Sequence, residues 1–119
     1  MSYIDGFVIP VPQGKKEAYL ALARTAAEIF TSLGATRVVE CWSDDVPDGK
    51  VTDFKMAVKA EAGEAVVFAW IEWPSKEVRD VGMKASSEDE RMKPHLADIP
   101  FDGKRMIFGG FAPMLDHKG

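Results

Sequence analysis

The most strand-like run of the chain is Val66-Val67-Phe68-Ala69-Trp70-Ile71-Glu72-Trp73. Successive residues of a strand point to opposite faces of its sheet, and this run is apolar at nearly every position. A run of this kind is typical of a strand that is buried on both faces. We therefore expect a sheet that is covered on both sides.

Three further segments have strand-like composition. Residues 3–11 are rich in β-branched and aromatic side chains and end at two prolines, which favour a turn because proline lacks the ladder donor. Residues 35–43 continue the β-type pattern. Residues 104–115 alternate around Gly109-Gly110, a pair that predicts a bulge or a close approach of the backbone. Together with residues 66–73, these segments give four predicted strands.

Two segments have helical spacing instead. In residues 15–33, apolar side chains recur every three to four positions, and Gly34 is placed to end that helix. We expect a second helix to begin after Ser75 as its N-cap. Its inner face would carry Val78, Val81 and Gly82.

Two stretches near these elements are harder to interpret. Ser87 and Glu90 have the spacing of a capping box, which predicts a further helical turn that Pro94 should end or kink. Residues 51–60 fit a short edge strand, a short helix or a loop folded over a partner. Asp44–Gly49 has turn chemistry and lacks the ligand pattern of a calcium loop.

The element order predicts an α+β, ferredoxin-like βαββαβ fold, with a four-stranded antiparallel sheet and both helices on one face. A chain of 119 residues suits one domain over residues 1–119. The second face of the sheet would then be uncovered, although residues 66–73 and 106–111 are apolar on both faces. Because exposed apolar patches of that size are rare in monomers, we expect a homodimer.

Composition narrows the class of protein further. The chain is 46% hydrophobic and 10% aromatic, which excludes intrinsic disorder, and its formal net charge of -4 argues against binding to nucleic acid or to an anionic membrane. It has one cysteine, an opening without the features of a secretory signal, and no run of about 20 apolar residues. We therefore expect a cytoplasmic protein without a membrane segment.

Three stretches carry a resemblance to a known family. They are the opening Ser2-Tyr3-Ile4-Asp5-Gly6-Phe7-Val8-Ile9-Pro10-Val11-Pro12, the middle Val39-Glu40-Cys41-Trp42 with Asp44-Asp45-Val46-Pro47-Asp48-Gly49-Lys50-Val51, and the closing Pro100-Phe101-Asp102-Gly103-Lys104-Arg105-Met106-Ile107-Phe108-Gly109-Gly110-Phe111. Over nearly its whole length the chain resembles the YbaA-like bacterial family of unknown function. The resemblance implies a dimeric α/β barrel, in which two ferredoxin-like protomers pack sheet against sheet, and it implies no established reaction.

That barrel superfamily includes cofactor-free monooxygenases, haem-degrading enzymes, haem peroxidases, isomerases and binding proteins. The resemblance therefore implies a cavity for a small ligand and nothing sharper. Its haem-degrading members use an asparagine, a tryptophan and a histidine together, whereas this chain contains no asparagine. We expect no cofactor.

Two strand glutamates are the main candidates for chemistry. Glu40 shares a predicted face with Trp42, as Glu72 does with Trp70, and the two faces could converge on one cavity if their strands form a hairpin. A carboxylate against tryptophan in a dry pocket has a raised pKa and can act as a general acid or base. The alternative is that each glutamate pairs with an arginine or reaches solvent at a strand end.

The remaining candidates are weaker. His95 suits a proton shuttle or haem ligand, or is an ordinary surface histidine. No second histidine or cysteine stands at ligand spacing, so we predict no metal site. Cys41, inside a predicted strand, is interpreted as a packed and unreactive thiol.

We therefore hypothesise that the protein binds a small, largely apolar molecule between sheet and helices. If it is an enzyme, Glu40 or Glu72 would be the base and His95 the shuttle for proton abstraction or cofactor-free oxygenation. The candidate ligand-binding residues are Tyr3, Asp5, Trp42, Phe68, Trp70 and Arg105. The alternative is a non-catalytic structural or interaction module, whose aromatic side chains simply fill the core of the dimer.

Overall fold

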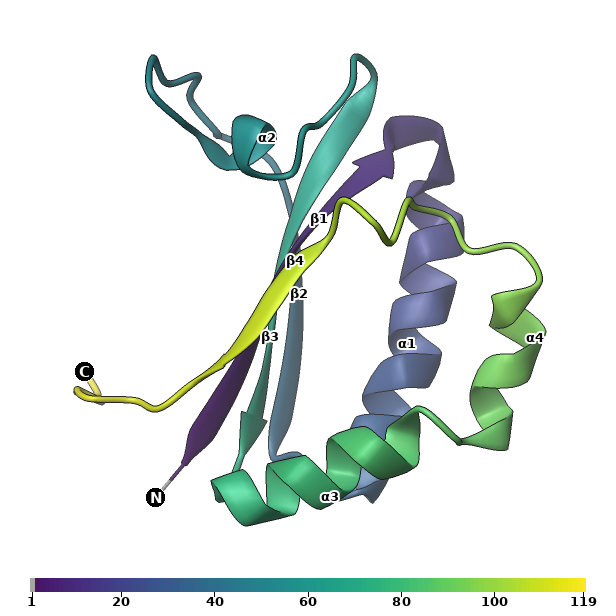
Figure 1. Cartoon of the computed structure of the whole chain (residues 1–119), viewed down its shortest axis with the longest axis vertical. Helices are drawn as coiled ribbons and strands as arrows, with labels where there is room; N and C mark the ends of the chain where they lie inside the picture. The colour runs from purple at the N-terminus through teal and green to yellow at the C-terminus, as the bar shows by residue number, and fades with distance from the viewer. Residues whose placement is uncertain (1) are drawn as a thin grey trace.

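The computed structural model describes residues 2–119 and confirms the predicted order of strands and helices (Figure 1). The elements are β1 (Tyr3–Pro12), α1 (Lys16–Ser32), β2 (Arg37–Trp42), α2 (Phe54–Ala57), β3 (Glu64–Trp73), α3 (Lys76–Ser86), α4 (Lys93–Leu96) and β4 (Ile107–Phe111). Two 3-10 turns, η1 (Gln13–Lys15) and η2 (Glu90–Met92), precede α1 and α4.

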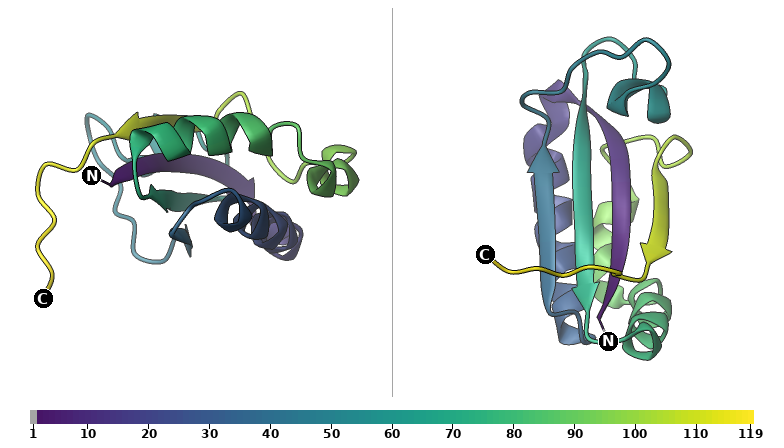
Figure 2. Two further views of the ribbon diagram at one scale, coloured as in Figure 1. Left: turned by 90° about the horizontal axis from the view of Figure 1, so that it is seen from below. Right: turned by 90° about the vertical axis from the view of Figure 1, so that its left-hand side faces the viewer.

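The four strands form one antiparallel sheet in the order β2-β3-β1-β4, which is the ferredoxin-like arrangement. Figures 1 and 2 show α1, α3 and α4 on one side of this sheet. We call that side the helix face and the other side the open face. The short helix α2 lies toward the open face, where the Phe54 and Phe68 rings are 6.0 Å apart.

Helix α1 packs on the sheet through an apolar stripe. Tyr19, Leu22, Ala23 and Ile29 are its buried residues, at the three- and four-residue spacing of one helix face. The helix stops at the predicted glycine, because Gly34 has a φ of 115°, which other residues rarely adopt. Among residues 2–119, no helix is long and apolar enough to cross a membrane.

Helix α3 begins as predicted, because the Ser75 hydroxyl accepts a hydrogen bond of 3.2 Å from the Val78 backbone N–H. It rests on the Trp73 ring through Gly82, where an added Cβ would lie 2.6 Å from Cζ3 of that ring. The expectation that Val81 also faces inward is wrong. Its side chain is largely exposed, because the helix turns Gly82 toward Trp73.

The segment after α3 differs from the capping-box prediction. Asp89, and not Ser87, caps the next turn by accepting a bond of 2.9 Å from the Arg91 N–H. The Ser87 hydroxyl instead donates to the Lys84 carbonyl. Pro94 lies in the first turn of α4 and does not end a helix. Backbone N–H groups in a first turn have no acceptor within the helix, so a proline there costs no hydrogen bond.

Residues 51–60, which the sequence left open, contain the short helix α2. Asp53 caps it by accepting a bond of 2.6 Å from the Met56 N–H.

The prediction of a buried Cys41 is wrong. This thiol is exposed, because it points to the open face from β2, which is an edge strand of the sheet.

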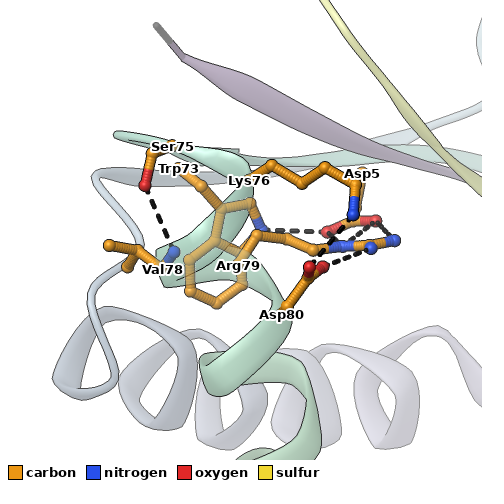
Figure 3. A network of polar contacts seen from close by, with 7 residues as sticks. All are labelled: Asp5, Trp73, Ser75, Lys76, Val78, Arg79 and Asp80. Atoms are coloured by element: carbon orange, nitrogen blue, oxygen red, sulfur yellow. Dashed lines mark hydrogen bonds and ion pairs between the residues drawn. The ribbon is translucent and has the colours of Figure 1, made fainter.

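A buried carboxylate links two strands, β1 and β3, to α3 (Figure 3). Asp5 is 3% exposed, and it accepts a bond of 2.9 Å from Trp73 Nε1. Arg79 donates to it through Nε, at 3.0 and 3.1 Å, and through Nη2 at 2.8 Å. The Arg79 guanidinium also lies 5.1 Å from the centre of the Tyr3 ring. We call these four residues the Asp5 network.

The neighbouring strand leaves room for this network at Gly110, which pairs with Asp5 in the sheet. A Cβ on Gly110 would lie 2.5 Å from the Tyr3 hydroxyl oxygen and 2.7 Å from Arg79 Nη2. The β1–β4 register runs without interruption past Gly109 and Gly110. Of the two predictions for this pair, the close approach is therefore the one that the structure contains.

Replacing Asp5 by Asn should lower the free energy of unfolding by about 3 kcal/mol, because it leaves Arg79 without its buried anionic partner. Urea unfolding followed by tryptophan fluorescence measures the change. The matched control is Asp80→Asn, which removes an exposed partner of the same arginine and should cost less than about 1 kcal/mol. Equal losses in the two variants would contradict the anchoring role of Asp5.

Candidate functional site

The sheet register separates the two glutamates that the sequence singled out. Glu40 pairs with Ala69, and Glu72 is three residues further along β3. Because side chains alternate between faces, an odd separation places them on opposite sides of the sheet. Glu40 lies on the helix face and Glu72 on the open face, so the expectation that both converge on one cavity is wrong.

A cavity of about 280 Å³ lies between the helix face of the sheet and α1. We call it the inner cavity. Its floor is formed by strand residues such as Phe7, Val38 and Ala69, and its walls are almost entirely aliphatic and aromatic. Three of the chain's six methionines contribute to it; they are Met83, Met92 and Met106. Unbranched thioether side chains adapt readily to ligands of irregular shape.

One polar pair stands in this apolar setting. The Tyr19 hydroxyl on α1 donates a hydrogen bond of 2.5 Å to Oε1 of Glu40 on β2. Both residues line the inner cavity, and among residues 2–119 Glu40 is the only charged residue that does so. A cavity with mainly apolar walls and a few placed polar groups is the usual form of a small-molecule site.

Burial changes the protonation of both groups. Desolvation raises the pKa of Glu40, and the hydrogen bond from Tyr19 opposes that rise without cancelling it. Desolvation, with the nearby Glu40 charge, raises the pKa of Tyr19 above its usual range. Tyr19 therefore remains a protonated donor, and Glu40, whose pKa is raised, is the group of the pair that can exchange a proton.

Glu40 is nevertheless in contact with solvent. A smaller recess of about 160 Å³ opens beside it, lined by Lys16, Leu20 and Trp42 among others. The Lys16 ammonium nitrogen lies 5.3 Å from the centre of the Trp42 ring. This recess explains why Glu40 keeps an exposed surface although its carboxyl group is desolvated on the cavity side, and it offers a path for a proton.

The open face carries a second part of the predicted set. Glu72 accepts a bond of 2.8 Å from Trp70 Nε1 and lies 3.7 Å from the Arg37 guanidinium. The Phe68 and Trp70 rings are 5.8 Å apart. Phe68 is almost half exposed and forms part of the surface, whereas Trp70 is half-buried and also belongs to the lining of the inner cavity.

Four other predicted residues have partners elsewhere. Asp5 and Tyr3 belong to the Asp5 network described above. Arg105 holds Glu64 through two bonds of 2.6 and 2.8 Å. His95 on α4 lies outside the lining of the inner cavity, with Nε2 3.0 Å from the Thr25 hydroxyl of α1. Of the predicted set, the structure therefore places Glu40 beside Trp42 at the recess and with Trp70 in the lining of the inner cavity. Glu72 and Phe68 instead contact Trp70 on the open face.

The partner of Glu40 was not among the candidate residues predicted from the sequence. Tyr19 lies on the buried stripe of α1, where it was counted as a core residue. The Tyr19 hydroxyl could have indicated this role, because the hydroxyl group of a buried tyrosine usually has a hydrogen-bond partner. The three methionines left no such signal, since they come from separate segments with no common period. Within residues 2–119, no group of three potential ligand side chains is placed to hold a metal ion.

Comparisons with known proteins agree with this architecture. The solved NIPSNAP domain protein from Burkholderia xenovorans superposes with a TM-score of 0.62 at 16% identity, covering 98% of this chain and 99% of that one. A variant of SnoaB, described as a cofactor-independent oxygenase from Streptomyces nogalater, gives 0.57 at 12% identity, covering 97% and 95%. Identities this low show a shared α+β fold and nothing more.

Sequence comparison reaches further. The Escherichia coli K12 protein described as "Uncharacterized protein YbaA" is 60% identical over 116 residues, which cover 98% of this chain and 99% of that protein. The family described as "Protein of unknown function (DUF1428)" matches residues 2–103. These two findings confirm the resemblance that the opening, middle and closing stretches carry. The chain belongs to the DUF1428 family.

Proposed function

We propose that this protein binds a small, mainly apolar molecule in the inner cavity, with Glu40 and Tyr19 as its polar contacts. The observation that carries the proposal is a desolvated carboxyl group, bonded to a phenol and surrounded by apolar walls. A protein that needed only a filled core would gain stability from replacing this pair by well-packed apolar side chains. The stability that the protein loses by keeping Glu40 and Tyr19 at this position is consistent with a role of the pair in ligand contact.

The same pair suits proton abstraction from the bound molecule. A base works best when its pKa is near the working pH, and burial moves Glu40 in that direction. Tyr19 would orient the carboxyl group, and the recess beside Trp42 would exchange the proton with solvent. Proton abstraction is the first step of an isomerisation, and also of a cofactor-free oxygenation with dioxygen as co-reactant. Glu72 and His95 have no part in this proposal because they lie outside the inner cavity.

A second feature favours self-association. The open face exposes Phe68, Ile107 and Phe111 beside the half-buried Trp70, and Met114 is fully exposed on the tail beyond β4. Figure 2 shows this tail crossing in front of the open face. We infer that two copies pack their open faces together as a homodimer. If the inner cavity bound nothing, this interface would support the alternative function, a non-catalytic module.

Enlarging Ala23 to leucine should weaken binding of the neutral probe N-phenyl-1-naphthylamine about tenfold. Ala23 is buried in the inner-cavity wall, and extra methylenes forced into such a site cost about 1–3 kcal/mol. Fluorescence titration measures the affinity. Ala21→Leu, on the exposed side of the same helix, is the control and should bind as the native protein does. Equal affinity in all three proteins would contradict binding in this cavity.

The raised pKa of Glu40 gives a pH signature. Because the folded state holds this proton more tightly than the unfolded state, Glu40 lowers the free energy of unfolding as pH rises through its folded pKa. Glu40→Gln should therefore gain stability relative to the native protein as pH rises above the ordinary pKa of a glutamate, measured by urea unfolding at each pH.

Tyr19→Phe is the matched variant for that experiment. It removes the hydrogen bond that lowers the Glu40 pKa, so the pH-dependent loss of stability should be larger and should continue to a higher pH than in the native protein. A constant difference between Glu40→Gln and the native protein across the pH range would rule out a raised pKa.

Replacing Phe68 by aspartate should weaken dimerisation about thirtyfold or more, because a charge at the centre of an apolar interface costs at least about 2 kcal/mol. Native mass spectrometry over a concentration series measures the monomer fraction. Val81→Asp introduces the same charge at an exposed position of α3, on the other side of the sheet, and should leave the dimer intact. A monomeric native protein would contradict the homodimer.

A further inference from the structure

A second and larger cavity lies on the helix side of the molecule. It has a volume of about 370 Å³ and is bounded by α1 on one side and by the segment from Ser86 to Leu96 on the other. We call it the outer cavity. Ile29, Phe30 and Leu96 give it apolar walls, and the polar residues around it include Glu88 and Lys93.

The two cavities adjoin each other. Ala26, Phe30 and Met92 line both of them. Ala26 and Phe30 are one helical turn apart on the same face of α1, so this helix forms a common wall. Met92 reaches the junction from the opposite side, at the end of η2. Its long unbranched side chain can change rotamer at little cost, so a narrow ligand can displace it.

The wall that carries Met92 is fastened to α1 on both sides of it in the sequence. Arg91 Nη2 donates a bond of 2.9 Å to the Ser32 hydroxyl, and His95 Nε2 lies 3.0 Å from the Thr25 hydroxyl. Thr25 and Ser32 are seven residues apart on α1, so the two links bracket the shared residues Ala26 and Phe30. The outer cavity is therefore a fixed part of the fold, and His95 has a place in holding it.

The lining limits the chemistry of a ligand. In the part of the chain that the structure describes, Glu40 is the only charged residue of the inner cavity, so these residues offer no cation to an anionic group. A hydroxyl can donate to the Glu40 carboxylate beside Tyr19. A junction closed by one methionine admits a hydrocarbon chain more easily than a fused ring system.

We propose that the inner and outer cavities form one elongated site for an uncharged long-chain alcohol, whose hydroxyl meets Glu40 and Tyr19 and whose chain passes Met92 into the outer cavity. This proposal rests on the proposed function, because it needs the inner cavity to bind a ligand. It adds the substrate class and a second binding region that the reactive pair does not touch.

The test is the affinity of a series of straight-chain primary alcohols, from butanol to decanol, measured by displacement of N-phenyl-1-naphthylamine. Each methylene buried in an apolar site should raise the affinity about fourfold. We expect this rise to continue through decanol in the native protein, because the chain has the outer cavity to enter.

Two variants locate the far end of the chain. Leu96→Asp places a charge on the wall of the outer cavity at a position that is already largely exposed, so the fold should tolerate it. This variant should bind decanol about tenfold more weakly than the native protein and should bind butanol with unchanged affinity. Met92→Trp fills the junction and should stop the rise in affinity at a shorter chain. Val81→Asp, exposed on α3 and outside both cavities, should behave as the native protein does.

Different results would overturn different claims. If the affinity of the native protein levels off at short alcohols and Leu96→Asp has no effect on decanol, the elongated site is wrong while the inner cavity still binds. If neither the probe nor butanol binds, the proposed function fails and this inference fails with it.

Discussion

A carboxylate removed from water is the constraint on which the arrangement of this fold depends. A charge of this kind costs several kcal/mol unless a cation and hydrogen-bond donors surround it, and Asp5 has both in Arg79 and Trp73. The pairing requires α3 to lie against the sheet, and it requires a strand neighbour without a side chain, which is Gly110. With α3 held in this way, Met83 becomes one wall of the inner cavity.

The helix face thus contains two carboxyl groups with different surroundings, of which Asp5 is buried and Glu40 keeps an exposed surface. Asp5 is paired with a guanidinium and with an indole N–H, so its lone pairs are occupied and its role is structural. Glu40 meets the neutral hydroxyl of Tyr19, beside an apolar cavity and a recess that reaches solvent. A carboxyl group in the second setting keeps a free oxygen and a raised pKa, which is why the proposed function rests on Glu40.

The two faces of the sheet are suited to different tasks. On the helix face, side chains from α1, α3 and the segment after it leave space between them, and the proposed ligand site uses that space. On the open face, aromatic side chains such as Phe68 and Phe111 lie near the surface and suit contact with a second copy. Because strand residues alternate between faces, β3 contributes to both, which is the physical basis of its apolar character on each side.

Local patterns in the sequence were enough to determine the strand and helix order, the Gly34 stop, the Ser75 cap and the close approach at Gly109-Gly110, since each depends on residues near one another in the chain. Alternation along one strand correctly grouped Glu40 with Trp42, but it carried no information about register between strands. Only the tertiary structure decided that Glu40 and Glu72 lie on opposite faces, that Tyr19 meets Glu40, and that three distant methionines share one cavity. These features depend on how separate elements pack, and packing is a property of the whole fold.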